Sequence, residues 1–404
     1  MKKGWEVKTL GEVCDVFTDG DWIEKKDQAT CGIRLIQTGN IGNGVFLDRI
    51  DKARYISEET FKCLRCTEVL PNDCLLSRLP DPVGRAGIIP DLGAKMITAV
   101  DCTIMRFNKS ILPKWFIYYS LSSLYQNEIN KAVSGATRQR ISRSNLGNVS
   151  IPIASFPEQK RIVGVLDKAF AAIDKAKENA EKNLANAREL FESYLQSVFA
   201  NPSPDWEVKK LGEIAEVKGG KRVPKGYRFE GNKTKYPYIS VSSFTDTGTI
   251  DSSEVKYISN IVFEKIKQYT ITSEDLYISI AGTIGKTGMV PAEFNGSNLT
   301  ENACKLVLQK KVNVKFIYYF TRTCDFKIQT GVNTRVAAQP KLSLDRLKTI
   351  TLPLPPISEQ KRIVAKLDAL SAETKKLEAV YQQKLADLDE LKKSILQKAF
   401  NGEL

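Results

Sequence analysis

An internal duplication constrains this chain more than any other feature. The run WEVKTLGEV at residues 5–13 returns as WEVKKLGEI at residues 206–214, with seven of nine residues unchanged. The run EQKRIV at residues 158–163 recurs without change at residues 359–364, and both recurrences lie 201 residues apart. Repeats of solenoid proteins are only about 20–50 residues long, so a period of this size is that of a domain. We therefore predict two copies of one module.

Each copy divides into two parts by composition. Residues 5–150 and 206–352 hold short runs of β-branched and aromatic residues separated by Gly, Asn and Asp, which predicts mixed α/β domains made mainly of strands. The run FIYY, at 116–119 and again at 316–319, is one residue out of the common frame and falls in a predicted helix. Prolines near 152 and 353 are expected to end each domain.

The segments that follow are helical in pattern. Residues 157–200 and 358–400 contain no internal proline, and apolar residues recur at spacings of three and four over five or six heptads. A helix of about 44 residues is about 65 Å long. A helix of this length with a single apolar stripe needs a partner, and its own duplicate is the nearest candidate. We expect an antiparallel coiled coil, a rod with one globular domain at each end and a pseudo-two-fold axis across its middle.

The resulting fold class is α+β, a tandem duplication with four parts. We place the first domain at 1–150, the first long helix and its linker at 151–205, the second domain at 206–352 and the second long helix at 353–404.

Charge and composition restrict the function. Lys and Arg number 60 against 47 Asp and Glu, so the net charge is +13 and a polyanion is the first partner to consider. The chain has no histidine, which excludes a Ser-His-Asp or Cys-His nucleophile system and a histidine base. No run of about 18 apolar residues occurs and the first residues are polar, so we expect a cytoplasmic protein with no membrane partner.

Enzyme signatures are weak. Residues 282–287, GTIGKT, look like the end of a phosphate-binding loop, but Ile280 stands where the first glycine is required and the other copy lacks Lys-Thr. A turn between strands is the favoured alternative. Cys63 and Cys66 have the spacing of zinc ligands without a second close pair, so ordinary thiols are favoured and no metal is expected. Asn201-Pro202 is interpreted as a helix stop.

The ordered motifs resemble a known family. The WExxxLGE openings, the EQKRIV helix starts and the closing LQKAFNGEL at 396–404 are similar to the specificity subunit of type I restriction-modification systems, over nearly the whole chain. The resemblance implies a non-catalytic subunit that reads a bipartite site in double-stranded DNA, binds two methyltransferase subunits and recruits restriction subunits. No cofactor is implied in this chain, since S-adenosylmethionine, ATP and Mg²⁺ are expected on the partners. One departure is that the Gly-Glu-Leu tail occurs once.

Candidate contact residues follow from the chemistry of DNA. Base edges are read by side chains with paired donors and acceptors, whereas phosphates need only positive charge. Candidates to read the first half-site are Arg34, Gln37, Asn40, Arg138, Gln139, Arg140 and Arg143. The second-copy counterparts of the last four, the cluster at 138–143, are Asn333, Arg335, Gln339 and Lys341. Phosphate contacts are expected from Arg78, Arg85, Lys221, Arg222 and Lys286. Candidates to bind partner subunits are Lys160, Arg161, Lys361 and Arg362.

Two alternatives stay open. Any of these residues could be an ordinary exposed charge on a basic protein, and Arg34 could simply flank a strand. The whole chain could instead be a coiled-coil scaffold whose two domains bind protein or RNA.

Overall fold

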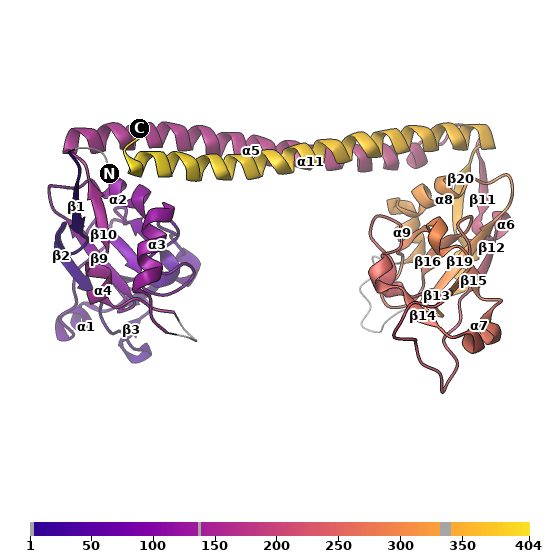
Figure 1. Cartoon of the computed structure of the whole chain (residues 1–404), viewed down its shortest axis with the longest axis horizontal. Helices are drawn as coiled ribbons and strands as arrows, with labels where there is room; N and C mark the ends of the chain where they lie inside the picture. The colour runs from indigo at the N-terminus through magenta and orange to yellow at the C-terminus, as the bar shows by residue number, and fades with distance from the viewer. Residues whose placement is uncertain (1–3, 136–138, 332–340) are drawn as a thin grey trace. The chain divides into compact units, whose positions relative to one another are not determined.

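The computed structural model describes residues 4–135, 139–331 and 341–404. It divides into two compact units (Figure 1). The first unit comprises Met1–Lys182 and Gln382–Leu404, and the second comprises Asn183–Tyr381. Each unit therefore holds one copy of the duplicated module together with parts of both long helices.

The first unit opens with short strands and few helices. Its strands are β1 (Glu6–Thr9), β2 (Cys14–Asp19), β3 (Gln28–Ala29), β4 (Ile33–Ile36), β5 (Arg54–Ile56), β6 (Cys74–Ser77), β7 (Ala86–Ile88), β8 (Met96–Thr98), β9 (Cys102–Phe107) and β10 (Ser150–Ile153). Its helices are α1 (Glu58–Cys63), α2 (Pro113–Ser120), α3 (Ser123–Ala132) and α4 (Arg143–Gly147), with 3₁₀ turns η1 (Lys25–Asp27), η2 (Thr38–Asn40) and η3 (Ile50–Lys52).

The second unit repeats this order. Its strands are β11 (Glu207–Lys210), β12 (Ala215–Gly219), β13 (Tyr236–Ile239), β14 (Lys256–Ile258), β15 (Thr270–Ile271), β16 (Leu276–Ser279), β17 (Thr287–Met289), β18 (Ser297–Leu299), β19 (Ala303–Leu308) and β20 (Thr351–Leu354). Its helices are α6 (Leu211–Ile214), α7 (Asn260–Ile266), α8 (Val314–Thr321), α9 (Cys324–Thr330) and α10 (Leu344–Thr349), with 3₁₀ turns η4 (Val241–Ser243), η5 (Ser252–Glu254) and η6 (Ala292–Phe294).

Sheet topology confirms the duplication. The first unit has sheets of order β2-β9-β6-β7 and β3-β5-β4-β8, and a two-stranded ribbon β1-β10. The second has β12-β19-β16-β17, β14-β13-β18-β15 and the ribbon β11-β20. A parallel strand pairing is also shared, as β4 with β8 and β13 with β18. The predicted mixed, mainly β domains are therefore correct.

Two long helices complete the fold. They are α5 (Phe156–Ala200) and α11 (Ile357–Asn401), each within one residue of the predicted limits. In the first unit Lys177 pairs with Asp389 at 2.6 Å and Asp174 with Lys392 at 3.1 Å, so the residue numbers run in opposite directions and the segments are antiparallel.

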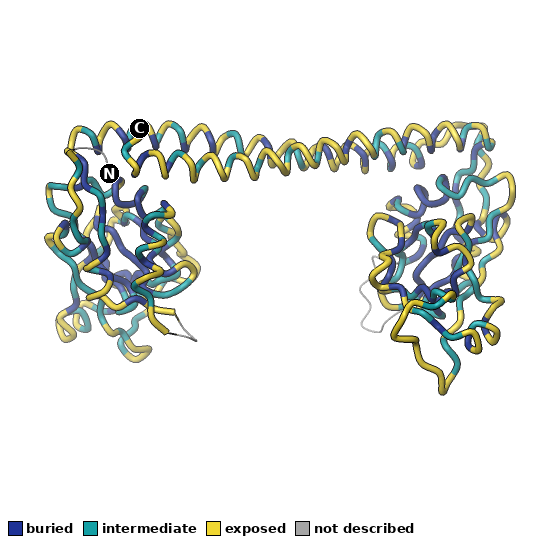
Figure 2. The backbone as a smooth tube through the Cα atoms, viewed as in Figure 1, coloured by how far each residue is buried: buried dark blue, intermediate teal, exposed yellow. Residues whose placement is uncertain are grey.

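The second unit repeats this antiparallel pairing, with Arg188 and Glu378 3.0 Å apart. These ion pairs are exposed and contribute little stability. The alternating buried and exposed positions along the two helices show that their apolar stripes carry the packing (Figure 2).

Aromatic side chains join the helices to the domains. In the first unit the Trp115 ring lies 5.4 Å from Trp5 and 5.0 Å from Phe400, which α11 supplies. In the second unit α5 supplies Phe199, whose ring lies 5.1 Å from Phe316. Such contacts contribute about 0.5–1.5 kcal/mol each beyond the burial of their area. Each domain core is thus completed by a residue from a distant part of the chain.

The prolines near 152 and 353 lie in the last strand of each domain, one residue before that strand ends. Pro152 lies within β10 opposite Val7, and Pro353 lies within β20 opposite Val208. Both strands belong to two-stranded ribbons, where every strand is an edge and leaves alternate N–H groups unpaired. A proline is tolerated there, so the chain turns only after the strand.

Among the helices in the described residues, none combines the length and apolar character needed to cross a bilayer.

Candidate nucleic-acid interface

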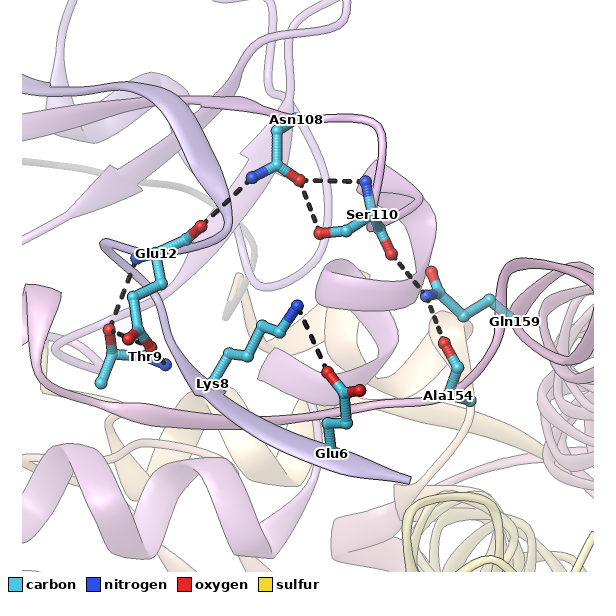
Figure 3. Close-up of polar contacts among 8 residues, drawn as sticks. All are labelled: Glu6, Lys8, Thr9, Glu12, Asn108, Ser110, Ala154 and Gln159. Atoms are coloured by element: carbon cyan, nitrogen blue, oxygen red, sulfur yellow. Dashed lines mark hydrogen bonds and ion pairs between the residues drawn. The ribbon is translucent and has the colours of Figure 1, made fainter. Parts of the chain in front are cut away.

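The first long helix is fixed to its domain by Gln159, which is fully buried (Figure 3). Its Oε1 accepts a hydrogen bond from the backbone N–H of Leu112 at 2.9 Å. Its Nε2 donates to the carbonyl oxygens of Ser110 at 2.8 Å and Ala154 at 2.9 Å. One side chain therefore ties the start of α5 to the segment before α2 and to the end of β10.

A chain of polar contacts continues from this point (Figure 3). The Asn108 Oδ1 accepts from the Ser110 N–H at 2.9 Å, and its Nδ2 donates to the Glu12 carbonyl at 3.1 Å. Glu12 in turn accepts the backbone N–H of Thr9 at 2.7 Å, and the hydrogen bonds from Thr9 lower the pKa of the Glu12 carboxyl. This network fixes the turn after β1 relative to the helix start.

The second copy has the same junction. Gln360, 1% exposed, accepts from the Asn313 N–H at 2.8 Å and donates to the carbonyls of Lys311 and Pro355 at 3.3 and 2.8 Å. The identical EQKRIV runs therefore have a shared structural role, because the buried glutamine of each determines how its domain joins its helix.

A second set of contacts joins α2 to α5. Tyr118 donates to Asp167 at 2.6 Å, and Lys114 pairs with the same carboxylate at 3.0 Å. Partial burial opposes ionisation of Asp167, but these two partners outweigh it and lower its pKa.

The second unit makes the equivalent contacts with residues 201 positions later. Tyr319 donates to Asp368 at 2.7 Å, and Lys315 pairs with it at 2.7 Å. Tyr118 and Tyr319 are therefore equivalent, and the FIYY runs that match by letter are displaced by one residue from the structural frame.

Two first-copy candidates lie inside the domain. Arg34, 6% exposed, pairs with Asp48 at 3.0 Å and donates to the Tyr55 hydroxyl at 3.3 Å. Asn40, 7% exposed, donates to the Leu47 carbonyl at 2.9 Å. Their polar groups hold the loop from β4 to β5 in shape.

Arg85 organises the neighbouring loops. Its guanidinium donates to the carbonyls of Ile41 and Leu79 at 2.7 Å and of Thr38 at 3.0 Å. Burial lowers its pKa. The side chain thus joins η2 to the loop after β6.

Lys286 occupies the matching position in the second unit. Its Nζ donates to the Phe244 carbonyl at 3.2 Å, as Arg85 does to Ile41, and pairs with Asp246 at 2.9 Å. Both residues were predicted to contact phosphates, and both have internal partners in the same place.

Arg78 is buried at the end of β6. It donates to the Val100 carbonyl at 2.6 Å and pairs with Asp19 at 3.3 Å. Its own carbonyl accepts from the Ile141 N–H at 3.3 Å, which brings the segment around residue 140 to this edge. There Arg140 pairs with Asp101 at 3.2 Å with half of its side chain exposed.

A basic hollow lies at η2 in the first copy. Half-buried Gln37 lines this hollow of about 420 Å³ together with the exposed Arg49, Lys52 and Arg54. Sequence reasoning missed these three basic residues, because they alternate with acidic ones in DRIDKAR and resemble a solvated loop. Gln139 and Arg143 are exposed as well. The first unit thus has amide and guanidinium groups around one basic hollow.

In the second copy, Lys221, Arg222 and Lys341 are exposed. Arg222 pairs with Glu301 at 2.5 Å, which raises the pKa of the guanidinium. Four further candidates lie outside the described residues: Arg138, Asn333, Arg335 and Gln339.

The four candidates at the helix starts are exposed. Arg161 binds Glu158 at 2.7 Å and also donates to the Leu404 carbonyl at 2.7 Å, and Arg362 binds Glu359 at 2.6 Å. Lys160 lies 4.9 Å from the Phe156 ring centre, and Lys361 faces solvent.

The two weak signatures lie in different settings. GTIGKT is the turn between β16 and β17, as favoured from the sequence. Cys63 is exposed and Cys66 buried, and the described residues contain no group of three His, Cys, Asp or Glu side chains able to hold a metal ion.

The chain has two copies of one domain with basic loops, and each copy packs against antiparallel segments of the two long helices. These features define a protein with two tandem binding modules. The family model of the type I restriction modification DNA specificity domain matches residues 2–183 and again 204–386. The chain belongs to this family and is a DNA specificity subunit of the type I restriction-modification class.

Individual relatives agree with this assignment. The chain is 25% identical over 436 aligned residues to the StySPI type I restriction enzyme specificity subunit of Salmonella potsdam, which covers the whole chain and 90% of the relative. It is 22% identical over 440 residues to the EcoKI specificity subunit of Escherichia coli K12, with coverage of 100% and 90%.

Solved structures share the fold. The HsdS subunit of Thermoanaerobacter tengcongensis superposes with a TM-score of 0.68 at 19% identity, over 100% of this chain and 98% of that one. A chain from a study of complex assembly and conformational transition in the type I R-M system superposes with a TM-score of 0.80, also at 19% identity, over 100% and 99%.

Proposed function

We propose that this subunit reads a bipartite site in double-stranded DNA, one half-site per duplicated domain. The observation that carries the proposal is that two domains of equal topology present different side chains at equivalent loops. Where the first has Gln37 at the N-cap of η2, the second has Ser240 at the N-cap of η4, and both side chains are only partly buried. A shared scaffold with different polar side chains suits two half-sites of different sequence.

The contacts divide into two groups in this proposal. Arg34, Asn40, Arg78 and Arg85 shape the loops, since each of these side chains bonds to groups within the domain. The half-buried Gln37 and the exposed side chains contact DNA. The exposed ones are Arg49, Lys52, Arg54, Gln139, Arg140 and Arg143 in the first domain, and Lys221, Arg222 and Lys341 in the second. Arg138, Asn333, Arg335 and Gln339 stay proposed base contacts on sequence grounds, and Lys286 a proposed loop organiser.

Catalysis is assigned to partners. The chain has no histidine, and its relatives are specificity subunits. Two methyltransferase subunits would bind the paired helices, with Lys160, Arg161, Lys361 and Arg362 at the proposed contacts, and restriction subunits would join them. The domains at 1–150 and 206–352 would act as independent readers.

Selection from a random duplex library tests the proposal. The full chain with its methyltransferase should enrich two short motifs at a fixed spacing. Enrichment of no duplex, or preferential binding of RNA or a protein, would favour the alternative of a coiled-coil scaffold.

A further inference from the structure

The segment between β12 and β13 carries an unusual charge. Residues 221–235 include one acidic residue, Glu230, and six basic ones: Lys221, Arg222, Lys225, Arg228, Lys233 and Lys235. The matching segment of the first copy, residues 21–32, has two basic and three acidic residues. The topology is shared but the charge is not, so this basic segment serves something that only the second domain does.

The charge is exposed and largely uncompensated. Every residue from 225 to 233 is exposed, and these residues form part of the loop that leads into β13 (Figure 2). Arg222 is paired with Glu301. Within the described residues, Lys225, Arg228, Lys233 and Lys235 have no acidic group within ion-pair distance. Concentrating like charges without partners costs free energy unless a polyanion binds there.

The segment is nevertheless fixed to the domain. The Glu230 N–H donates to the Tyr257 carbonyl at 2.9 Å, and the Phe229 ring lies 5.2 Å from that of Tyr238. The Tyr227 N–H closes a turn onto the Pro224 carbonyl at 3.2 Å. These contacts hold the middle of the segment against β13 and β14.

Two lysines from outside the segment add to the surface. The Nζ of Lys256 lies 4.8 Å from the centre of the Phe229 ring, and the Nζ of Lys265 lies 5.3 Å from that of Tyr227. A ring face attracts a cation, so these rings position the two ammonium groups beside the segment.

We propose that residues 221–235, together with Lys256 and Lys265, form a phosphate-binding surface for the backbone of double-stranded DNA. The inference rests on the proposed function and adds to it that the second domain binds more phosphates than the first. Six of these eight cations are lysines, whose ammonium group is a point charge without the planar fork that reads base edges. The surface therefore contributes affinity without sequence preference.

The test is the salt dependence of DNA binding by the full chain. A variant with Lys225→Gln, Arg228→Gln, Lys233→Gln and Lys235→Gln removes up to four phosphate contacts. The slope of log Kobs against log salt should become shallower by about 0.9 per lost contact, or up to about 3.6 in all. Binding to every duplex should weaken together, and the selected bases should stay the same.

A matched variant controls for net charge. Lys168→Gln, Lys175→Gln, Lys384→Gln and Lys398→Gln remove the same charge from exposed positions of the long helices, and the slope should stay near that of the parent. Equal slopes of log Kobs against log salt for the two variants would overturn the proposed phosphate-binding surface. A changed motif, or an unchanged slope with loss of methyltransferase binding, would also overturn it. If the parent itself selects no bipartite motif, the proposed function fails instead.

Discussion

Gln159 and Gln360 show how single residues determine the joint between domain and helix. Each buried carboxamide has three backbone partners, which lie in the preceding domain and at the end of its last strand. A buried N–H or C=O that loses its partner costs about 1–3 kcal/mol. The buried glutamine therefore gives a physical reason for the match between the two EQKRIV runs. The exposed lysine and arginine of each run give no such reason.

Replacing Gln159 with Leu should therefore destabilise the first unit. The change leaves the Leu112 N–H and two carbonyls without their partner, so the free energy of unfolding should fall by about 2–4 kcal/mol. Urea unfolding followed by tryptophan fluorescence measures it. Gln383→Leu is the control, because Gln383 is exposed on α11 and bonds only Asp387; its shift should stay within about 0.5 kcal/mol. Similar shifts in the two variants would contradict the role of the junction.

Substitutions at the hollow of the first domain should distinguish a base contact from a phosphate contact. Gln37→Ala should cost about 1–3 kcal/mol at one base position of one half-site, if the amide reads a base edge there. Lys52→Ala should weaken all duplexes alike and reduce the salt slope by about 0.9. Competition binding with singly substituted duplexes measures both. Uniform weakening by Gln37→Ala would show that this side chain reads no base.

At the scale of elements, the long helices were predictable and the loop residues were not. The three-and-four spacing of apolar residues placed α5 and α11 within one residue of their limits, because burial of a stripe leaves a periodic record in the sequence. Burial of Arg34 and Arg78 leaves no such record, since their partners Asp48 and Asp19 lie far away along the chain or in other strands. Which of the candidate side chains are exposed and which are buried could be learned only from the structure.

The sequence pattern also predicts that the length of the long helices determines the spacing of the half-sites. Each of α5 and α11 runs from one unit into the other. Four helix-forming residues inserted after Lys182 and after Tyr381 would lengthen each by about 6 Å. Base pairs are about 3.4 Å apart, so the preferred spacer should grow by one or two base pairs with the half-site bases unchanged.

Methylome sequencing of a strain that carries both insertions gives the spacer directly. An insertion of four residues at exposed position Gly93, in the loop between β7 and β8 of the first domain, serves as the control and should leave the spacer as it is. An unchanged spacer in the helix variant would rule out helix length as its determinant.

At the scale of the whole molecule, the duplication explains both what the copies share and where they differ. Strand order, the parallel pairing, the buried glutamine and the Tyr-Asp-Lys contacts recur at a near-constant offset, because they build the scaffold. The loops after β4 and β13 and the segments before those strands differ in side chain and charge. Sequence alone revealed the repeat and aligned Arg85 with Lys286, whereas the internal contacts that these two side chains share came from the structure.

One measurement tests the central claim that each duplicated domain reads one half-site. Residues 5–150 are exchanged for the matching domain of a relative with a different half-site, and the methylated motif of the strain is mapped by sequencing. We predict that one half of the motif takes the sequence of the donor while the other half and the spacer persist. Replacement of both halves, or of the spacer, would contradict the account.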